Sequence, residues 1–270
     1  MTHRIHPTAA IHPKAQLAEG VEVGPYAVIG EAVWIGARTR IGAHVVIEGC
    51  VKVGVDNQIF PGAAIGLAPQ DVSYRGAESW VEIGDRNQIR EYVTIHRPTQ
   101  AENLTRIGHD NFLMAYTHIA HNCWIEDDVT IANTVGLGGY VHVESKAVIG
   151  GMTGVHQKVH IGQCAMVGGM SRINRDVPPY TLVEGNPVRV RGLNKVGLRR
   201  NGILPDSATF QELKQVYRLL YRSSDPFAVV LAHLADQPLD YPSAHLIQFL
   251  QQAQQPGRRG TISGRGPCND

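Results

Sequence analysis

Large aliphatic residues recur at every sixth position of this chain, and this period constrains the fold more than any other feature. Between positions 5 and 167 the register has 28 positions, and 25 of them hold Ile, Leu or Val. A period of six fits neither an α-helix, at about 3.6 residues per turn, nor a simple strand, at about two. It is typical of a parallel β-helix, in which three hexapeptides form one triangular coil of eighteen residues.

The residues around these aliphatics fit the same geometry. Each coil would stack on the previous one at about 4.8 Å, the spacing of hydrogen-bonded strands. The position four residues after each aliphatic is mostly small or β-branched, as at Ala9, Ala27 and Val45, and would fill the interior near a corner. Such a core is a thin column, so each coil depends on its neighbours for stability. We therefore predict an all-β parallel β-helix over residues 1–190.

Two interruptions and one change of period divide the chain. The hexapeptide register breaks at 66–82 and, more briefly, at 97–106, and we expect an extruded loop at each. Residues 191–255 change to a helical period, with Phe210, Leu213 and Tyr217 on one side, which predicts a C-terminal α-helical domain. Residues 256–270 are rich in Gly, Pro and Arg and predict a disordered tail.

Composition argues against several classes of protein. The formal net charge is +1, and no apolar run approaches the roughly 20 residues of a membrane span. The four cysteines form no CxxC pair and are interpreted as reduced thiols. The repeat begins at Ile5, which leaves no room for a signal peptide. We expect a cytoplasmic protein with no membrane span and no nucleic acid partner.

Charge is distributed unevenly along the chain. From Met170 to Arg222 there are ten Lys or Arg and four Asp or Glu, so this tract carries a net charge of +6. A tract of this kind can bind phosphates or an acidic protein, and it can equally be a solvated helix face. Charge alone leaves both interpretations open.

Stacking by eighteen residues indicates which side chains become neighbours. His121, Gly139 and Gln157 have this spacing, so they should form a column along one corner, roughly 5 Å apart per coil. His142 and His160 should form a second column. A histidine beside a glycine N–H can act as a general base next to an oxyanion site. A lone histidine is more often structural, so this pattern leaves a structural role open.

Three segments of the chain carry more specific motifs, namely Leu113-Met-Ala-Tyr-Thr-His-Ile-Ala-His-Asn, Ile149-Gly-Gly-Met-Thr-Gly-Val-His-Gln and Asp176-Val-Pro-Pro-Tyr. With these motifs the chain resembles one known family, the UDP-N-acetylglucosamine O-acyltransferases of lipid A biosynthesis. The resemblance covers nearly the whole chain, to about residue 254. The first two motifs are fairly specific, whereas many acyltransferases and some non-enzymes share the bare repeat.

The resemblance implies a left-handed β-helix that forms homotrimers, with active sites in clefts between adjacent copies. Acyl carrier protein would deliver a 3-hydroxyacyl thioester, and the 3-hydroxyl of UDP-N-acetylglucosamine would attack its carbonyl. His121 matches the general base of the family, and Gly139 matches the backbone N–H that holds the oxyanion. The resemblance implies no cofactor and no metal.

Eight further positions match substrate-contacting residues of the family, namely Asp71, His118, His156, Gln157, Asn194, Arg200, Gly169 and Met170. The first would contact the sugar, and the two histidines would line the pocket. The residues at 157, 194 and 200 would contact the nucleotide. The last two would limit the acyl chain, and glycine at 169 implies a longer rather than a short chain.

The chain also departs from the family pattern. Asn122 follows the base where the family often has Asp, Ser73 replaces a loop lysine, and Tyr140 replaces a histidine. These changes bear on the orientation of His121 and on substrate contacts more than on the reaction itself.

Three other functions remain open at the level of sequence. A related hexapeptide acyltransferase could use another sugar acceptor, although that family usually carries an N-terminal uridine-binding domain. A metal-dependent enzyme of the γ-carbonic anhydrase type needs three converging histidines, for which His118, His121 and His142 are candidates. A non-catalytic scaffold would need neither the extruded loop nor the histidine motif.

Overall fold

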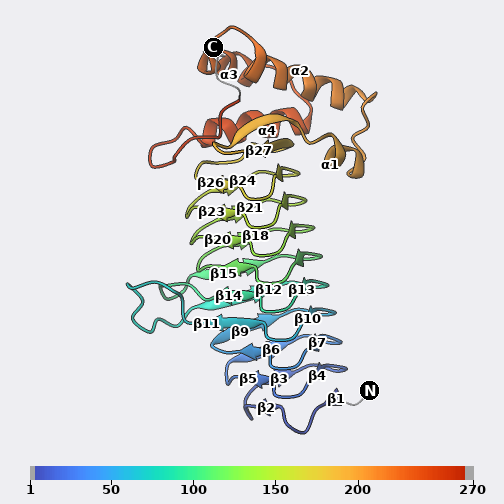
Figure 1. Ribbon diagram of the computed structural model, residues 1–270, viewed down its shortest axis with the longest axis vertical. Helices are drawn as coiled ribbons and strands as arrows, with labels where there is room; N and C mark the ends of the chain where they lie inside the picture. The colour runs from blue at the N-terminus through green and yellow to red at the C-terminus, as the bar shows by residue number, and fades with distance from the viewer. Residues whose placement is uncertain (1–3, 265–270) are drawn as a thin grey trace.

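Parallel strands stack into three sheets along the length of the computed structural model, which describes residues 4–264 (Figure 1). Each coil contributes one short strand to each sheet, and the chain winds from the N-terminus at one end to a cap of helices at the other. The parallel β-helix predicted from the six-residue period is therefore confirmed.

The three sheets form the three faces of a prism and are called A, B and C here. Sheet A contains β1 (Arg4–Ile5), β4 (Glu22–Val23), β7 (Arg40–Ile41), β10 (Gln58–Ile59), β13 (Gln88–Ile89), β16 (Phe112–Leu113), β19 (Thr130–Ile131), β22 (Val148–Ile149), β25 (Met166–Val167), β27 (Thr181–Glu184) and β28 (Arg189–Leu193). Sheet B contains β2 (Ala10–Ile11), β5 (Val28–Ile29), β8 (Val46–Ile47), β11 (Ala64–Leu67), β14 (Thr94–His96), β17 (His118–Ile119), β20 (Gly136–Leu137), β23 (Gly154–Val155) and β26 (Arg172–Ile173). Sheet C contains β3 (Gln16–Leu17), β6 (Val33–Ile35), β9 (Cys50–Val53), β12 (Trp80–Ile83), β15 (Leu104–Ile107), β18 (Trp124–Ile125), β21 (His142–Val143) and β24 (His160–Ile161).

Two loops leave the coils, at 68–79 after β11 and at 97–103 after β14 (Figure 1). Both fall within the segments where the sequence predicts a break. Ile65 pairs with Ile95, and Ile95 pairs with Ile119. The two loops therefore lengthen a coil to thirty and to twenty-four residues, which are both multiples of six. The aliphatic register survives the insertions for this reason, but residues eighteen apart are not neighbours there.

The turns between sheets repeat at three corners, each named by the sheets that it joins. Corner A–B carries Tyr92, Tyr116, Met152 and Met170, corner B–C carries Asn122, Tyr140 and Lys158, and corner C–A carries Arg86, Asp110, Lys146 and Cys164, all with positive φ. Side chains at one corner stack along the prism axis, as the rings of Tyr92 and Tyr116 do at 5.2 Å. The corner on which a residue lies therefore decides which other residues it can meet.

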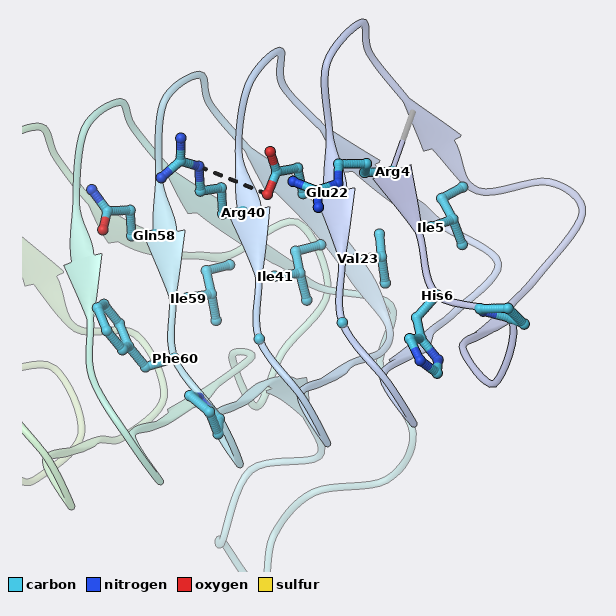
Figure 2. A pocket seen from close by; sticks show the side chains of 14 residues that line it. Arg4, Ile5, His6, Glu22, Val23, Arg40, Ile41, Gln58, Ile59 and Phe60 are labelled. Carbon is cyan, nitrogen blue, oxygen red and sulfur yellow. Dashed lines mark ion pairs between the residues drawn. The ribbon is translucent and has the colours of Figure 1, made fainter. Parts of the chain in front are cut away.

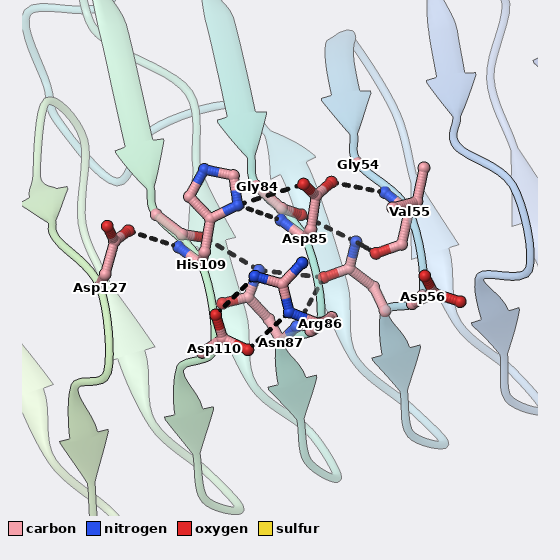
Figure 3. Close-up of polar contacts among 12 residues, drawn as sticks. Gly54, Val55, Asp56, Gly84, Asp85, Arg86, Asn87, His109, Asp110 and Asp127 are labelled. Atoms are coloured by element: carbon pink, nitrogen blue, oxygen red, sulfur yellow. Dashed lines mark hydrogen bonds and ion pairs between the residues drawn. The ribbon is translucent and has the colours of Figure 1, made fainter.

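The interior is mostly aliphatic, but corner C–A has a polar lining that the sequence analysis did not predict. Asn57, Asn87 and Asn111 are each no more than 1% exposed. The side-chain oxygen of Asn57 accepts the N–H of Asn87 at 2.9 Å, and that of Asn87 accepts the N–H of Asn111 at 2.9 Å. Figure 3 shows Asn87 in this corner beside the exposed ion pair of Arg86 with Asp110. Buried backbone N–H groups need partners, and the asparagines supply them where a corner interrupts the strand ladder.

Four helices cover the C-terminal end of the prism. They are α1 (Lys195–Arg200), α2 (Ala208–Arg222), α3 (Phe227–Ala235) and α4 (Tyr241–Gln252). The Ser207 hydroxyl caps α2 by accepting the N–H of Phe210 at 3.2 Å. The antiparallel hairpin β27–β28 connects the last coils to α1. No helix in residues 4–264 is long and apolar enough to cross a membrane.

The segment 256–264, for which the sequence predicts disorder, runs beside the last coil. Arg258 pairs with Asp176 at 2.6 Å, and Ile262 is 2% exposed. Asp176 is itself buried, so its carboxylate requires a charged or hydrogen-bonding partner, and Arg258 provides one. The predicted disorder of 265–270 lies outside the described residues.

Candidate active site

A cleft of about 500 Å³ lies where corner B–C meets the loop 68–79. Its lining includes Asp71 from the loop, His118 and His121 from the β17 coil, Gly139 from the next coil and Gln157 from the coil after that. Five of the residues proposed from the sequence are thus brought together. The loop insertion folds over the face of sheet B, which explains how a residue fifty positions earlier reaches His121.

The ring of His121 lies directly against Gly139. A Cβ added at Gly139 would clash with Cε1 and Nε2 of that ring, so only glycine fits at this position. Within residues 4–264, the Gly139 N–H donates no hydrogen bond to the protein. The eighteen-residue spacing of the two residues therefore produces the contact that it predicts, with a free backbone donor beside an imidazole.

Asn122 orients the His121 ring. The Nδ1 atom of His121 lies 2.8 Å from Oδ1 of Asn122, and the Asn122 N–H donates to the Thr105 hydroxyl at 2.8 Å. An amide oxygen can only accept, so Nδ1 carries the proton and Nε2 keeps its lone pair. Tyr140 packs edge-on against the same ring, with centroids 5.4 Å apart.

Asp71 faces the free side of the imidazole. Its Oδ2 atom lies 3.5 Å from Nε2 of His121, and its Oδ1 atom accepts the N–H and the hydroxyl of Ser73, both at 2.8 Å. The hydrogen bonds from Ser73 lower the pKa of Asp71, because they favour the charged carboxylate. Ser73 therefore fixes the position and the charge of this carboxylate.

His118, which lines the cleft, has a second histidine beside it, because the ring of His96 lies 5.2 Å from its own ring. His118 Nδ1 shares a hydrogen bond of 2.8 Å with the Thr94 hydroxyl, and His96 Nδ1 donates to the carbonyl of Ala68 at 2.7 Å. Burial lowers the pKa of both rings, and nearby histidines act in the same direction. Sequence reasoning missed Thr94, because it lies twenty-four residues before His118 across the second loop.

The remaining predicted residues lie elsewhere in the chain. His156 is beside the cleft lining, with Nδ1 3.1 Å from the carbonyl oxygen of Gln157. Asn194 is buried, caps α1 by accepting the N–H of Gly197 at 3.0 Å, and donates to the carbonyl of Cys164 at 2.9 Å. Arg200 ends α1 and is exposed. Both Asn194 and Arg200 thus belong to the region of corner C–A, whereas His121 lies on corner B–C.

Gly169 and Met170 lie on corner A–B, at the opposite edge of sheet B from His121. Met170 is 74% exposed. The outward positions of sheet B between the two corners include Gly136 and Gly154, and a Cβ added to either would meet no atom within 4 Å. The face between these corners is consequently open and shallow.

The histidines considered for a metal site do not converge within one copy of the chain. His142 lies on sheet C, where it stacks on Trp124 at 4.3 Å and contacts Glu126 at 2.8 Å. His118 lies on sheet B. Within residues 4–264, no group of three or more His, Cys, Asp or Glu side chains is arranged to hold a metal ion.

A larger hollow, of about 710 Å³, lies on sheet A at the N-terminal coils. Figure 2 shows Arg4, Glu22, Arg40 and Gln58 in a row across successive strands, with His6 and Phe60 at the other edge. Within residues 4–264, no histidine of this hollow packs against a glycine as His121 does. The chemistry described above therefore belongs to the smaller cleft at His121.

Fold and cleft together define a hexapeptide-repeat acyltransferase. The model of the bacterial transferase hexapeptide matches residues 14–49 and 104–139, and that of domain 2 of UDP-N-acetylglucosamine O-acyltransferase matches residues 176–262. The chain belongs to the UDP-N-acetylglucosamine O-acyltransferase family, whose fold is the left-handed parallel β-helix.

Individual relatives support this assignment over most of the chain. The acyl-[acyl-carrier-protein]–UDP-N-acetylglucosamine O-acyltransferase of Synechocystis sp. is 56% identical over 222 residues, which is 82% of this chain and 80% of the relative. That of Thermodesulfovibrio yellowstonii is 43% identical over 92% of this chain and 96% of the relative. The crystal structure of the Moraxella catarrhalis UDP-N-acetylglucosamine O-acyltransferase is 42% identical, with a TM-score of 0.86 over 92% of this chain and 96% of that one.

Proposed function

We propose that this chain transfers a 3-hydroxyacyl group from acyl carrier protein to the 3-hydroxyl of UDP-N-acetylglucosamine, a reaction of lipid A biosynthesis, with His121 as general base. The names of its relatives support the two substrates. The observation that carries the mechanism is the contact of the His121 ring with Gly139, whose N–H donates to no protein acceptor in the described part of the chain.

The sugar hydroxyl is activated at Nε2 of His121. Since the Asn122 amide keeps the proton on Nδ1, Nε2 accepts the hydroxyl proton as the oxygen attacks the thioester carbonyl. A new C–O bond forms, the C–S bond then breaks, and the imidazolium returns the proton to the departing thiol. No other proton donor is needed, because one group takes the proton and gives it back.

The Gly139 N–H stabilises the charge that develops on the carbonyl oxygen. A fixed backbone donor beside the attacking group provides an oxyanion site that requires no reorganisation during the reaction. Asp71 and His118 line the same cleft and orient the sugar by hydrogen bonds.

A homotrimer would complete the site. Asn194 and Arg200 lie toward another corner of the prism, so Arg200 can reach a nucleotide bound at His121 only from a neighbouring copy. Exposed apolar side chains follow corner A–B, including Tyr92, Tyr116 and Met152, each at least 54% exposed. Burying such a stripe between copies removes it from water. The acyl chain would run toward Gly169 and Met170 on this corner, whereas His156 would line the pocket and Gln157 would contact the nucleotide.

The substitution His121→Ala tests this function. We expect no acyl transfer from acyl carrier protein to UDP-N-acetylglucosamine, measured by mass spectrometry of the product, with an unchanged oligomer mass. His44→Ala is the matched control, because His44 also lies on a corner but far from the cleft, stacked on Tyr26. Full activity of His121→Ala would contradict the mechanism. Product made only with a different amino sugar acceptor would assign the chain to the related acyltransferase.

A further inference from the structure

A second polar hollow, of about 360 Å³, lies beside the last coil of the β-helix. Its polar lining comes from the β26 coil, the β27–β28 hairpin and the C-terminal segment, and consists of Arg172, Asn174, Arg175, Asn186, Arg189 and Ser263. Arg172 and Arg175 of the β26 coil therefore lie beside Arg189 of β28. They account for part of the basic tract whose role the sequence left open.

Within residues 4–264, no carboxylate neutralises the charge of this hollow. No carboxylate lines it, and within residues 4–264 none of the three guanidinium groups forms an ion pair. Arg189 donates to the Ser263 hydroxyl at 2.9 Å, and the Val190 N–H donates to the carbonyl of Ser263 at 2.9 Å. The C-terminal segment thus closes one side of the hollow and holds one arginine in place. Three like charges kept together without a carboxylate indicate a site for an anion.

The hollow is aligned with the candidate active site. Arg175 follows β26 as His121 follows β17, and β17, β20, β23 and β26 are successive strands of sheet B, so Arg175 lies three coils beyond His121, or about 14 Å along the prism axis. Arg172 pairs with Gly154, which in turn pairs with Gly136, and Gly136 pairs with His118. Because neither glycine carries a side chain, none projects from this column of sheet B between His118 and Arg172.

We propose that Arg172, Arg175 and Arg189 form a binding site for a phosphate group of a substrate during acyl transfer. Guanidinium groups match phosphate oxygens with paired hydrogen bonds, and the amides of Asn174 and Asn186 supply further donors. Both substrates of the proposed function carry such a group: the diphosphate of the sugar nucleotide, and the phosphodiester of the pantetheine arm on the carrier. The inference therefore rests on the proposed function for the source of the phosphate.

The double variant Arg172→Gln/Arg175→Gln tests the site, with Arg4→Gln, at the other end of the prism, as the control for a lost positive charge. KM and kcat are measured for UDP-N-acetylglucosamine and for three acyl donors: the acyl carrier protein, acyl-4′-phosphopantetheine and acyl-pantetheine without phosphate. Binding of pyrophosphate to the whole protein is measured by calorimetry, which does not depend on activity. Circular dichroism and oligomer mass establish that the variants fold.

We expect the double variant to raise one KM at least about tenfold with kcat within about twofold, as the loss of charged hydrogen bonds predicts. A raised KM for UDP-N-acetylglucosamine identifies the diphosphate. A raised KM for both phosphate-bearing donors, but not for acyl-pantetheine, identifies the pantetheine phosphodiester. An effect on acyl carrier protein alone assigns the arginines to a protein surface and overturns the proposal.

Pyrophosphate binding tests the anion site independently of acyl transfer. Binding by the wild type that the double variant loses supports the anion site even if no acyl transfer is detected, in which case only the proposed function fails. Unchanged KM values and equal pyrophosphate titrations in wild type, control and double variant would overturn the anion site while leaving the acyltransferase intact.

Discussion

The Nδ1 atom of His121 lies 2.8 Å from the side-chain oxygen of Asn122, the next residue in the chain. Adjacent residues rarely direct their side chains at each other, but Asn122 has a φ of 60° at a corner of the β-helix, and its N–H is held by Thr105. This turn aims the amide oxygen back at the imidazole. The candidate base is therefore oriented by its own corner and requires no distant residue.

Two replacements of Asn122 should show whether catalysis depends on an acceptor that orients the His121 ring or on the charge of that acceptor. Asn122→Asp keeps an acceptor for the Nδ1 proton, so we expect kcat within about threefold of the wild type. Asn122→Ala removes the acceptor, and we expect kcat to fall roughly 10- to 100-fold with little change in KM. Steady-state kinetics with both substrates measure the difference. Equal kcat values for the Ala and Asp variants would show that the contact does not orient the base.

Gly139→Ala should abolish most of the activity without unfolding the protein. The added methyl group would occupy the space of the His121 ring and push the ring from the free N–H. We expect kcat to fall at least about 100-fold, the size of effect seen when an oxyanion donor is misplaced. Gly192→Ala in β28 is the control, because its added methyl group meets no atom within 4 Å. Retention of wild-type kcat by Gly139→Ala would remove Gly139 from the mechanism.

Low pH should destabilise the contact between the β-helix and the helical cap. At this contact Glu144 lies between His160 and His245 of α4. The nitrogen–oxygen distances from these histidines to Glu144 are 2.8 and 3.2 Å. The Gln163 N–H also donates to Glu144, and the Tyr180 hydroxyl shares a hydrogen bond with Nδ1 of His245. Burial alone would raise the pKa of Glu144, but the contacts with the two histidines prevail and lower it from 4.5 to about 2. Burial lowers the pKa of His160 below 6.5.

Protonation of Glu144 and protonation of His160 both lower the stability of the folded protein. The unfolded chain binds protons more readily at each, so stability falls as the pH drops below 6.5 for His160, and between 4.5 and about 2 for Glu144. We expect the melting temperature to decline over both ranges. Glu144→Gln should have a lower melting temperature at neutral pH and a flatter decline below pH 4.5. A decline of unchanged steepness in this variant would exclude Glu144 as its source.

Two inactive variants should restore activity when they assemble together. If His121 of one copy works with Arg200 of its neighbour, a mixed oligomer of His121→Ala and Arg200→Ala chains contains some sites with both native residues. Purification on both tags leaves only mixed trimers, in which one of the three sites has both native residues, so we expect recovery of roughly a third of the wild-type activity per site. Co-expression of the two variants with different tags, followed by purification on both, supplies the sample. Activity no higher than that of either single variant would place both residues in one copy.

Much of the fold was predictable because the hexapeptide period is a local property of the chain. An aliphatic residue at every sixth position predicts a side chain that points into the core. Both loops preserve this period, because each lengthens its coil by a multiple of six residues. The contact between His121 and Gly139 follows from the same count, since no insertion separates their coils. Thr94 was missed because a loop lengthens its coil, and the buried ladder of Asn57, Asn87 and Asn111 carries no aliphatic signal.

The amino-acid sequence by itself determined the coil, its register and the pairing of an imidazole with a glycine, because each depends only on counting along one repeating unit. The tertiary structure alone decided which corner each residue occupies, how the loop carrying Asp71 folds over His121, and that Arg172, Arg175 and Arg189 meet in one hollow. Those contacts join segments that share no period. They depend on how the hairpin, the helical cap and the C-terminal segment pack against the last coil, which no spacing in the sequence records.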